Sequence, residues 1–378
     1  MKVGIITFHF TTNQGAVMQC YALKTWLEMH GHDVYVINYR PPYHTVRYMP
    51  HKNPFRAALA TWRNMSRRSF FNRLYITFGS FVKSIIGNIK HVDKERYRIF
   101  QKFTSHYFNE TAEYRTLKAL KRNPPELDLY ISGSDQLWNP VILDASLDAA
   151  YFLDFGPKET RKITYAVSTK EKYSEEEKQT IEKLSKNLDA ISLREQNYDV
   201  EISVSQPVHI CIDPTLLLDL EDYTALQASP METEPYLFVY GFQGIKEIDD
   251  AVRIIADSLH LRVINGSPKV KLTTDHKKVY DYGPREFLSY IANADFVVSN
   301  SFHATAFSII YQKNFVVVPH TTRGRRMIEL LGKLGLSDRL WYDDSCAWQQ
   351  PLDYEDVRQK LSDLRTESES YLLDNLAQ

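Results

Sequence analysis

The sequence predicts an α/β protein made of two doubly wound domains. Its 378 residues are more than one hydrophobic core usually holds. Apolar runs with strand character alternate with stretches of helical periodicity along most of the chain. A polar stretch at residues 218–234 interrupts this alternation, which then resumes. The alternation predicts parallel sheets with helices on both faces, and the interruption predicts a domain boundary near residue 225.

The first domain, residues 1–225, opens with a strand, a helix and a second strand. These elements are predicted at residues 2–8, 16–31 and 33–39. Two parallel strands joined through a helix cross over right-handed. Further strands are predicted at residues 127–133, 161–168, 190–195 and 207–213. A helix at residues 174–188 begins with Ser174 and Glu177 in capping-box spacing.

The second domain, residues 226–378, repeats the pattern. Strands are predicted at residues 235–242, 261–267, 277–283, 296–298 and 315–318, and helices at residues 245–260, 284–294 and 304–312. A last helix covers residues 353–376, and its return to the first domain is left open. Ligands of such sheets bind beyond the carboxyl ends of the strands, so we expect the two domains to face a cleft that holds the site.

A basic helical insertion is predicted in the first domain at about residues 45–110. Within residues 51–100, eleven Lys or Arg stand against only Asp93 and Glu95, interleaved with aromatic and aliphatic residues. One interpretation is a solvated insertion that packs its apolar side on the domain. The other is a surface for an anionic, membrane-held partner, because clustered basic and aromatic residues favour anionic lipid head groups.

Composition and motifs exclude several classes of protein. The net charge of −1 implies no general attraction to nucleic acid, and three scattered cysteines suit neither a disulfide framework nor a zinc site. No signal segment precedes the first strand, and no apolar run reaches the ~18 residues of a membrane span. We therefore expect a cytoplasmic protein. Glycine-rich dinucleotide, Walker, zinc-protease and esterase motifs are absent, which leaves an anion-using transferase or a binding protein.

The strongest candidate site is the turn at residues 299–305, between a predicted strand and a predicted helix. A helix N-terminus offers unpaired N–H groups and positive potential, so this turn suits an anion. His303 lies in the turn and would be protonated beside a bound polyanion, where it can act as an acid. The alternative is a histidine that only makes local hydrogen bonds.

Arginines follow two other strands. Arg194, next to Glu195, can hold a carboxylate or phosphate with two parallel hydrogen bonds, and the alternative is a surface ion pair. Arg323, Arg325 and Arg326 precede a predicted helix and again favour an anion, with a solvated basic loop as the alternative.

Residues after the strand at 127–133 suit a sugar. Asp135, Trp138 and Asn139 combine an acid, an aromatic face and an amide, and the alternative is a turn with Asp135 at a cap position. Asn13, in the polar loop at residues 11–15, can serve either a site or a turn.

Several blocks, in order, resemble those of the polysaccharide pyruvyltransferase family. They include GIITFHFTTNQGAVMQCYALKTWL, DLYISGSDQLWN, ISLRE, CIDPTLLL and FVVSNSFHATAF. The resemblance covers residues 1–339 apart from the basic insertion, and the Ser-Phe-His block is its most specific part.

This resemblance implies a fold like that of the two-domain GT-B glycosyltransferases. It implies transfer of a pyruvyl group from phosphoenolpyruvate, as co-substrate, to a sugar as a ketal bridging two hydroxyls, with no cofactor and no metal. His303 matches the family's catalytic histidine, a general acid. Arg194 matches the arginine that grips the carboxylate or phosphate of the donor.

The chain departs from the family pattern at Ser301, where another branch has an arginine two places before the histidine. Arg326, or its neighbours Arg323 and Arg325, can supply the missing charge near the donor. Asp135, Trp138, Asn139 and Asn13 are the candidates for the acceptor. Family acceptors are often cell-surface glycans built on a lipid carrier at the inner membrane face, which would give residues 51–100 a purpose.

Two alternatives remain at this level. One is a nucleotide-sugar glycosyltransferase of the same fold. The other is a non-catalytic relative that binds a glycan or an anion, because the arginine is lost at Ser301.

Overall fold

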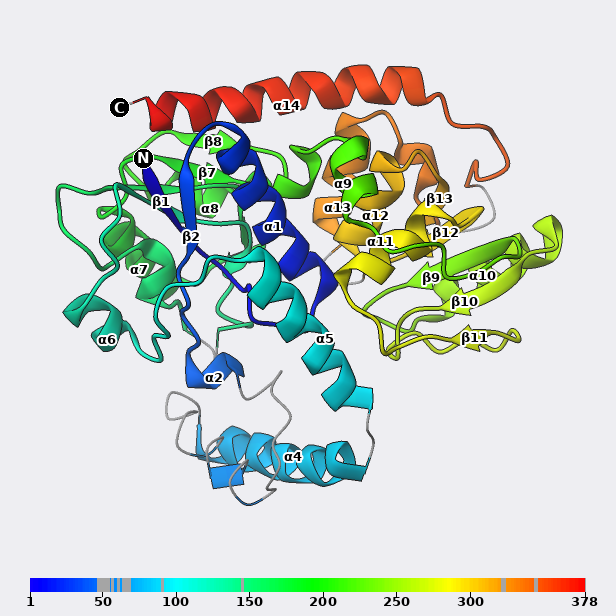
Figure 1. The fold of residues 1–378 in the computed structure, drawn as a ribbon, viewed down its shortest axis with the longest axis horizontal. Coiled ribbons are helices and arrows are strands. Elements are labelled where there is room, and N and C mark those ends of the chain that lie inside the picture. Colours follow the sequence, from blue (N-terminus) through cyan, green and yellow to red (C-terminus); the bar gives the residue numbers. More distant parts are fainter. Residues whose placement is uncertain are drawn as a thin grey trace. The chain divides into compact units, whose positions relative to one another are not determined.

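The computed structural model describes residues 1–45, 55, 58–59, 62, 69–89, 92–143, 146–320, 324–342 and 346–377 (Figure 1). The chain divides into two compact units, one of Met1–Pro214 with Ser368–Gln378 and one of Thr215–Glu367. The first unit ends before residue 225, where the sequence placed the boundary. The reason is that the polar stretch after Pro214 contains helix α9 (Leu220–Leu226), whose Tyr223 packs edge-on against Phe307 of the second unit at 5.0 Å between ring centroids.

The first unit contains parallel strands throughout. One sheet has the order β2-β1-β3-β5 and the next has the order β4-β6-β7-β8. The strands are β1 (Lys2–Ile6), β2 (Asp33–Val36), β3 (Leu129–Ser132), β4 (Asp135–Trp138), β5 (Arg161–Thr164), β6 (Val167–Thr169), β7 (Ile191–Leu193) and β8 (Val208–Ile210). A parallel bridge between Ile163 and Ala190 links the two sheets. Because β2 and β3 lie on opposite sides of β1, the strand order reverses at β1, and such reversals are where doubly wound folds bind ligands.

The helices of the first unit are set by local signals. They are α1 (Gln14–Met29), α2 (Pro42–Thr45), α4 (Phe70–Ile89), α5 (Val92–Tyr107), α6 (Leu117–Arg122), α7 (Glu175–Ser185) and α8 (Tyr198–Glu201), with a short 3-10 turn, η1 (Ala149–Phe152). The predicted capping box is confirmed: the Ser174 hydroxyl accepts from the N–H of Glu177, and the Glu177 carboxylate accepts from the N–H of Ser174. Helices α4 and α5 show the predicted helical character of the basic insertion, most of whose first half lies outside the described residues.

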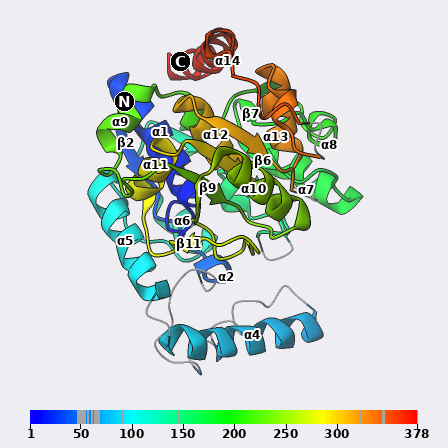
Figure 2. The ribbon, with the colours of Figure 1, turned by 90° about the vertical axis from the view of Figure 1, so that its right-hand side faces the viewer.

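The second unit contains a five-stranded parallel sheet with the order β11-β10-β9-β12-β13, whose strands are labelled in Figure 1. Figure 2 shows the ribbon turned by 90°, with β9 and β11 of this sheet labelled. The strands are β9 (Tyr236–Tyr240), β10 (Arg262–Asn265), β11 (Lys277–Lys278), β12 (Phe296–Ser299) and β13 (Asn314–Val317). The helices are α9, α10 (Lys246–Leu259), α11 (Pro284–Ala292), α12 (Phe302–Ile310), α13 (Arg325–Lys333) and the start of α14 (Tyr354–Leu376), with turns η2 (Pro214–Leu216) and η3 (Ser337–Arg339).

Strand β9 shows why both faces of this sheet are covered. Leu237 and Val239 belong to one buried cluster with Val252 of α10. On the opposite face of the sheet, the ring of Phe238 stacks on the ring of Tyr290 of α11, with the ring centroids 5.4 Å apart. Successive strand residues point to opposite faces, so the continuous apolar run of β9 serves a helix on each side. The predicted fold class, an α/β protein of two doubly wound Rossmann-like units, is confirmed.

Helix α14 belongs to both units. Its last part lies with the first unit, where Tyr371 donates to the carbonyl of Thr164 at 2.9 Å and Glu369 accepts from the indole of Trp26 at 3.0 Å. Its earlier part lies with the second unit, where Arg365 pairs with Asp219 at 2.5 Å. One helix therefore contributes to the core packing of both units.

None of the described helices is both long enough and apolar enough to cross a membrane. In the same part of the chain no three His, Cys, Asp or Glu side chains gather in a way that could hold a metal ion.

Candidate active site

The turn from β12 into α12 is built from three small polar residues. The Ser299 hydroxyl donates to the carbonyl of Tyr240 at 2.6 Å and accepts from the N–H of Ser301 at 2.9 Å. Ser301 is the N-cap of α12, and its hydroxyl accepts from the N–H of Ala304 at 3.5 Å. His303 follows in the first turn of the helix, 7% exposed. The expectation that an ionisable ring lies where the strand becomes a helix is therefore met, and the helix dipole presents positive potential there.

Asn300 ties this turn to the end of the neighbouring strand. Its side-chain oxygen accepts from the N–H of Phe242 at 2.7 Å, and its amide donates to the carbonyl of Gln243 at 2.7 Å. Gly241 allows this approach, because a Cβ there would lie 2.3 Å from the Asn300 side-chain oxygen. The carboxyl ends of β9 and β12, where the strand order of the second unit reverses, are thus held together. Asn300 lies within the candidate turn predicted at residues 299–305, but no signal in the sequence assigned it this role of its own.

The three candidate arginines differ in placement. The Arg326 guanidinium lies 5.8 Å from the ring centroid of Phe302, the residue next to His303. Arg325 instead pairs with Glu329 at 2.6 Å and is exposed. Arg323 lies outside the described residues. The structure therefore brings Arg326 to the start of α12, together with Ser301 and His303.

Arg194 lies in the first unit, directly after β7. Its Nη2 is 2.7 Å from the carboxylate of Asp213 and 2.6 Å from the hydroxyl of Ser134. The side chains of Arg194 and Asp213 are 3% and 0% exposed. The alternative of a surface ion pair is therefore wrong, since the pair is buried at the carboxyl ends of β3, β7 and β8. Sequence reasoning missed Asp213, the last residue of one predicted strand, and Ser134, which directly follows another.

Trp138 is not available to a sugar. It is fully buried, its ring stacks on Phe152 with ring centroids 4.3 Å apart, and its indole N–H donates to the carbonyl of Tyr151 at 3.2 Å. The prediction of an exposed aromatic face is wrong, because Trp138 is a core residue of β4. A residue pattern that suits a sugar also suits a strand that enters the core.

Asp135, Asn139 and Asn13 stabilise backbone turns. Asp135 has a φ of 81°, and its carboxylate accepts from the N–H of Gln136 at 2.8 Å. A non-glycine residue in the left-handed region costs on the order of 1 kcal/mol or more and is concentrated at functional sites. The Asn139 side-chain oxygen accepts from the N–H of Val141 at 3.1 Å, and that of Asn13 caps α1 through the N–H of Gly15 at 3.0 Å.

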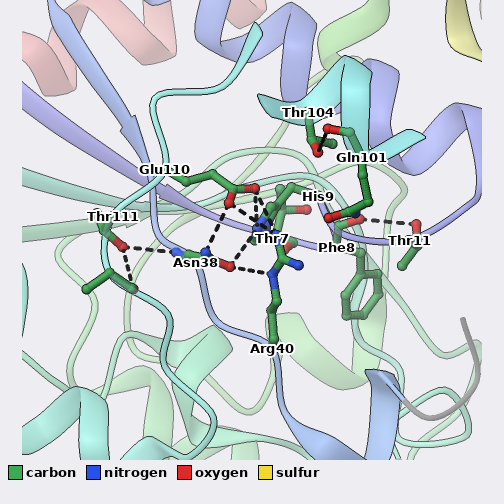
Figure 3. Close-up of polar contacts among 11 residues, drawn as sticks. Thr7, Phe8, His9, Thr11, Asn38, Arg40, Gln101, Thr104, Glu110 and Thr111 are labelled. Atoms are coloured by element: carbon green, nitrogen blue, oxygen red, sulfur yellow. Dashed lines mark hydrogen bonds and ion pairs between the residues drawn. The ribbon is translucent and has the colours of Figure 1, made fainter. Parts of the chain in front are cut away.

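A buried polar cluster around His9 was missed from the sequence (Figure 3). Arg40 reaches both carboxylate oxygens of Glu110 at 3.1 Å and donates to Asn38 at 2.6 Å, and Asn38 donates to Glu110 at 3.0 Å. The His9 Nδ1 faces the carbonyl of Thr7 at 3.1 Å, and its Nε2 lies 3.4 Å from Glu110. The available signal was that His9 follows β1 while Asn38 and Arg40 follow β2.

Burial lowers the pKa of His9, although Glu110 opposes that shift. Arg40 donates hydrogen bonds to both oxygens of the Glu110 carboxylate, and its positive charge also lowers the pKa of His9. The Nδ1 atom is placed to donate to the carbonyl of Thr7, and the Nε2 atom faces oxygens of both Glu110 and Asn38.

The sequence model of one protein family, polysaccharide pyruvyl transferase, matches residues 13–322. The chain belongs to this family. The matched residues include His303, Ser301 and Arg194 and end before Arg325 and Arg326. The family match, made independently of the geometry, confirms the resemblance read from the sequence blocks.

Solved structures show only a distant likeness. A protein assigned as UDP-N-acetylglucosamine 2-epimerase from Listeria monocytogenes has 9% sequence identity and a TM-score of 0.49, covering 100% of this chain and 90% of that chain. The UDP-GlcNAc 2-epimerase from Methanocaldococcus jannaschii has 10% identity and a TM-score of 0.44, covering 96% and 92%. No curated protein matches the chain.

Proposed function

We propose that this transferase moves a pyruvyl group from phosphoenolpyruvate to a sugar of a cell-surface polysaccharide or of its lipid-linked precursor, forming a pyruvate ketal. Membership of the polysaccharide pyruvyl transferase family supports a pyruvyl transfer. The observation that carries the proposal is His303, nine-tenths buried in the first turn of α12 beside the N-cap Ser301. A histidine beside an anion-binding helix start suits an acid that acts on an anionic donor.

In the proposed reaction His303 donates a proton to the methylene carbon of phosphoenolpyruvate, which becomes the methyl group. The adjacent carbon becomes electron-poor and is attacked by one sugar hydroxyl. A second hydroxyl then forms the other carbon–oxygen bond while the bond from that carbon to the phosphate oxygen breaks. Of the two hydroxyl protons released, one restores His303 and the other leaves with phosphate. General acid catalysis contributes ~10²–10⁴-fold, and binding and electrostatics supply the rest.

The donor carries a carboxylate and a phosphate, so the site must bind two negative groups. We propose that the start of α12, with Ser301 and Arg326, binds one of them. Arg326 would replace the arginine that another branch of the family has at the place of Ser301, since its guanidinium lies against Phe302. Within the first unit, Arg194 stays a proposed donor-binding residue, with Asp213 fixing the direction of its guanidinium.

Asp135, Asn139 and Asn13 are the proposed acceptor residues of the first unit. The strained backbone at Asp135 is the observation that favours it over the other two. The proposal needs no metal and no cofactor besides the co-substrate. It places the enzyme in the cytoplasm, at the membrane face where lipid-linked glycans are assembled.

The experiment that tests the proposed function follows the methyl group. The enzyme is incubated in D₂O with phosphoenolpyruvate and glycan precursors extracted from the source cells, and products are analysed by NMR. A ketal methyl carrying one deuterium is expected with the wild type, because an exchangeable acid delivers the new hydrogen, and His303→Gln should form it far more slowly. Incorporation of a glycosyl group from a UDP-sugar would establish the glycosyltransferase instead. Retention of a glycan without release of phosphate would indicate a binding protein.

A further inference from the structure

Helix α4 presents an aromatic face to solvent. Phe70, Phe71, Leu74, Tyr75 and Phe78 are each between 51% and 81% exposed. Their spacing of one, three, one and three residues keeps all five on one side of the helix. A soluble protein seldom leaves such a contiguous apolar surface uncovered, so this face has a partner.

The opposite side of α4 is partly covered and holds a charged residue. The Arg73 guanidinium lies 4.2 Å from the ring centroid of Trp62 and donates to the carbonyl of Trp62 at 2.6 Å. Ile76 and Thr77, on the same side, are half-buried. The helix thus turns a cation toward the protein and rings toward water, which is the reverse of an ordinary surface helix.

The charge of the surrounding sequence decides between possible partners. Nine Lys or Arg and no Asp or Glu occur in residues 41–92, although the whole chain has a net charge of −1. A second copy of the chain would bring an equally basic segment toward this one and be repelled. An anionic lipid surface offers both an apolar layer for the rings and negative head groups for the cations.

We propose that α4 docks in the plane of an anionic membrane, with Phe71, Tyr75 and Phe78 inserted at the level of the head groups. The helix lies in the interface, as amphipathic helices with one aromatic face and flanking basic residues do. This goes beyond the proposed reaction and does not depend on it, because lipid binding needs neither donor nor acceptor. If both hold, docking brings the enzyme to acceptors that are carried on lipids.

The test compares binding to vesicles of phosphatidylcholine with binding to vesicles that also contain phosphatidylglycerol, measured by sedimentation. The triple variant Phe71→Ser/Tyr75→Ser/Phe78→Ser removes three exposed rings. The control Val141→Ser/Tyr198→Ser/Tyr342→Ser removes equally exposed apolar side chains elsewhere. Since all six positions are exposed, both variants should unfold at the temperature of the wild type.

We expect the wild type to bind only the vesicles that contain phosphatidylglycerol, and salt should weaken this binding. Phe71→Ser/Tyr75→Ser/Phe78→Ser should bind them at least about tenfold more weakly, and the control should bind them as the wild type does. A second readout gives the location: Phe71→Trp should be quenched by brominated phosphatidylglycerol, and Tyr198→Trp should not. Equal binding of both triple variants, or no binding to either vesicle, overturns the proposal. If sedimentation velocity then shows a dimer that the Phe71→Ser/Tyr75→Ser/Phe78→Ser variant loses, the face is an interface between copies.

Discussion

Arg194 and Asp213 form a buried ion pair, with the guanidinium Nη2 2.7 Å from the carboxylate. Arg194 directly follows β7, and Asp213 lies three residues after β8, which is the neighbour of β7 in the sheet. Ser134, after β3, takes a further hydrogen bond from the same nitrogen at 2.6 Å. The guanidinium is therefore held in one position within the first unit, as the proposed role of Arg194 in donor binding requires.

Removing only one residue of the Arg194–Asp213 ion pair should strongly reduce the stability of the folded protein. Asp213→Ala leaves a buried guanidinium without its carboxylate and is expected to lower the free energy of unfolding by about 3–5 kcal/mol. The double variant Arg194→Met/Asp213→Leu removes both charges and should cost less than the sum of the two single changes. Urea unfolding of Asp213→Ala, of the single variants Arg194→Met and Asp213→Leu, and of the double variant measures both effects. Strict additivity would show that the two side chains do not interact.

Gly241 and Asn300 should be energetically coupled. Gly241→Ala places a Cβ 2.3 Å from the Asn300 side-chain oxygen and should cost about 1–3 kcal/mol of stability. Asn300→Ala should cost a similar amount, about 1–3 kcal/mol, because the N–H of Phe242 loses its buried acceptor. In Gly241→Ala/Asn300→Ala the Asn300 side-chain oxygen that clashes with the new Cβ is absent. The loss of stability in this double variant should therefore be smaller than the sum of the losses in the two single variants. A double variant as destabilised as the sum predicts would contradict the described contact.

The His9 cluster predicts how stability depends on pH. Burial lowers the pKa of folded His9 below the ordinary value of about 6.5 that it has when unfolded. The unfolded chain therefore takes up the proton first, and stability is lost as the pH falls from above 6.5 toward the lowered value. Glu110 and Arg40 are the charged groups that face the ring.

The measurement for this prediction is the free energy of unfolding between pH 5.5 and 7.5. His9→Gln should lose less stability on acidification than the wild type does. His106→Gln, which removes an exposed histidine from the same unit, is the matched control. An unchanged pH dependence in His9→Gln would contradict the prediction, because it would show that the pKa of His9 is the same in the folded and unfolded chain.

His303 should matter for turnover and little for folding. His303→Gln is expected to lower kcat by ~10²–10⁴-fold with the proposed substrates, because the acid is lost while binding groups remain. His276→Gln, at another histidine of the second unit, should keep wild-type rates. Equal losses of kcat in both variants would point to damage to the unit as a whole.

The fold could be predicted from the sequence because its signals are local. Continuous apolar runs such as β9 predict strands buried on both faces, and a glycine or a capping serine marks where a helix ends or begins. The boundary at residue 225 was less accurate because α9 is short and polar on its outer side, and short helices resemble linkers.

The site could be predicted only in part. His303, Ser301 and Arg194 were singled out from their positions after strands, which is a local property, and their roles stay predictions. The role of Trp138 was predicted wrongly, because the sequence does not distinguish a tryptophan that binds a sugar from one that stacks on Phe152 in the core. Glu110 could not be linked to His9, because the contact joins residues about one hundred positions apart and depends on how the chain after α5 returns to β2.

Arg326 and Arg325 offer the most direct test of the central claim, that phosphoenolpyruvate binds at the start of α12. The measurement is thermal unfolding of the wild type, Arg326→Ala and Arg325→Ala with phosphoenolpyruvate, UDP-sugars or plain phosphate. A ligand at a hundredfold excess over its dissociation constant adds ~2.7 kcal/mol of stability. The account predicts that phosphoenolpyruvate stabilises the wild type and Arg325→Ala, stabilises Arg326→Ala much less, and exceeds the effect of phosphate. Stabilisation by UDP-sugars with none by phosphoenolpyruvate would contradict it.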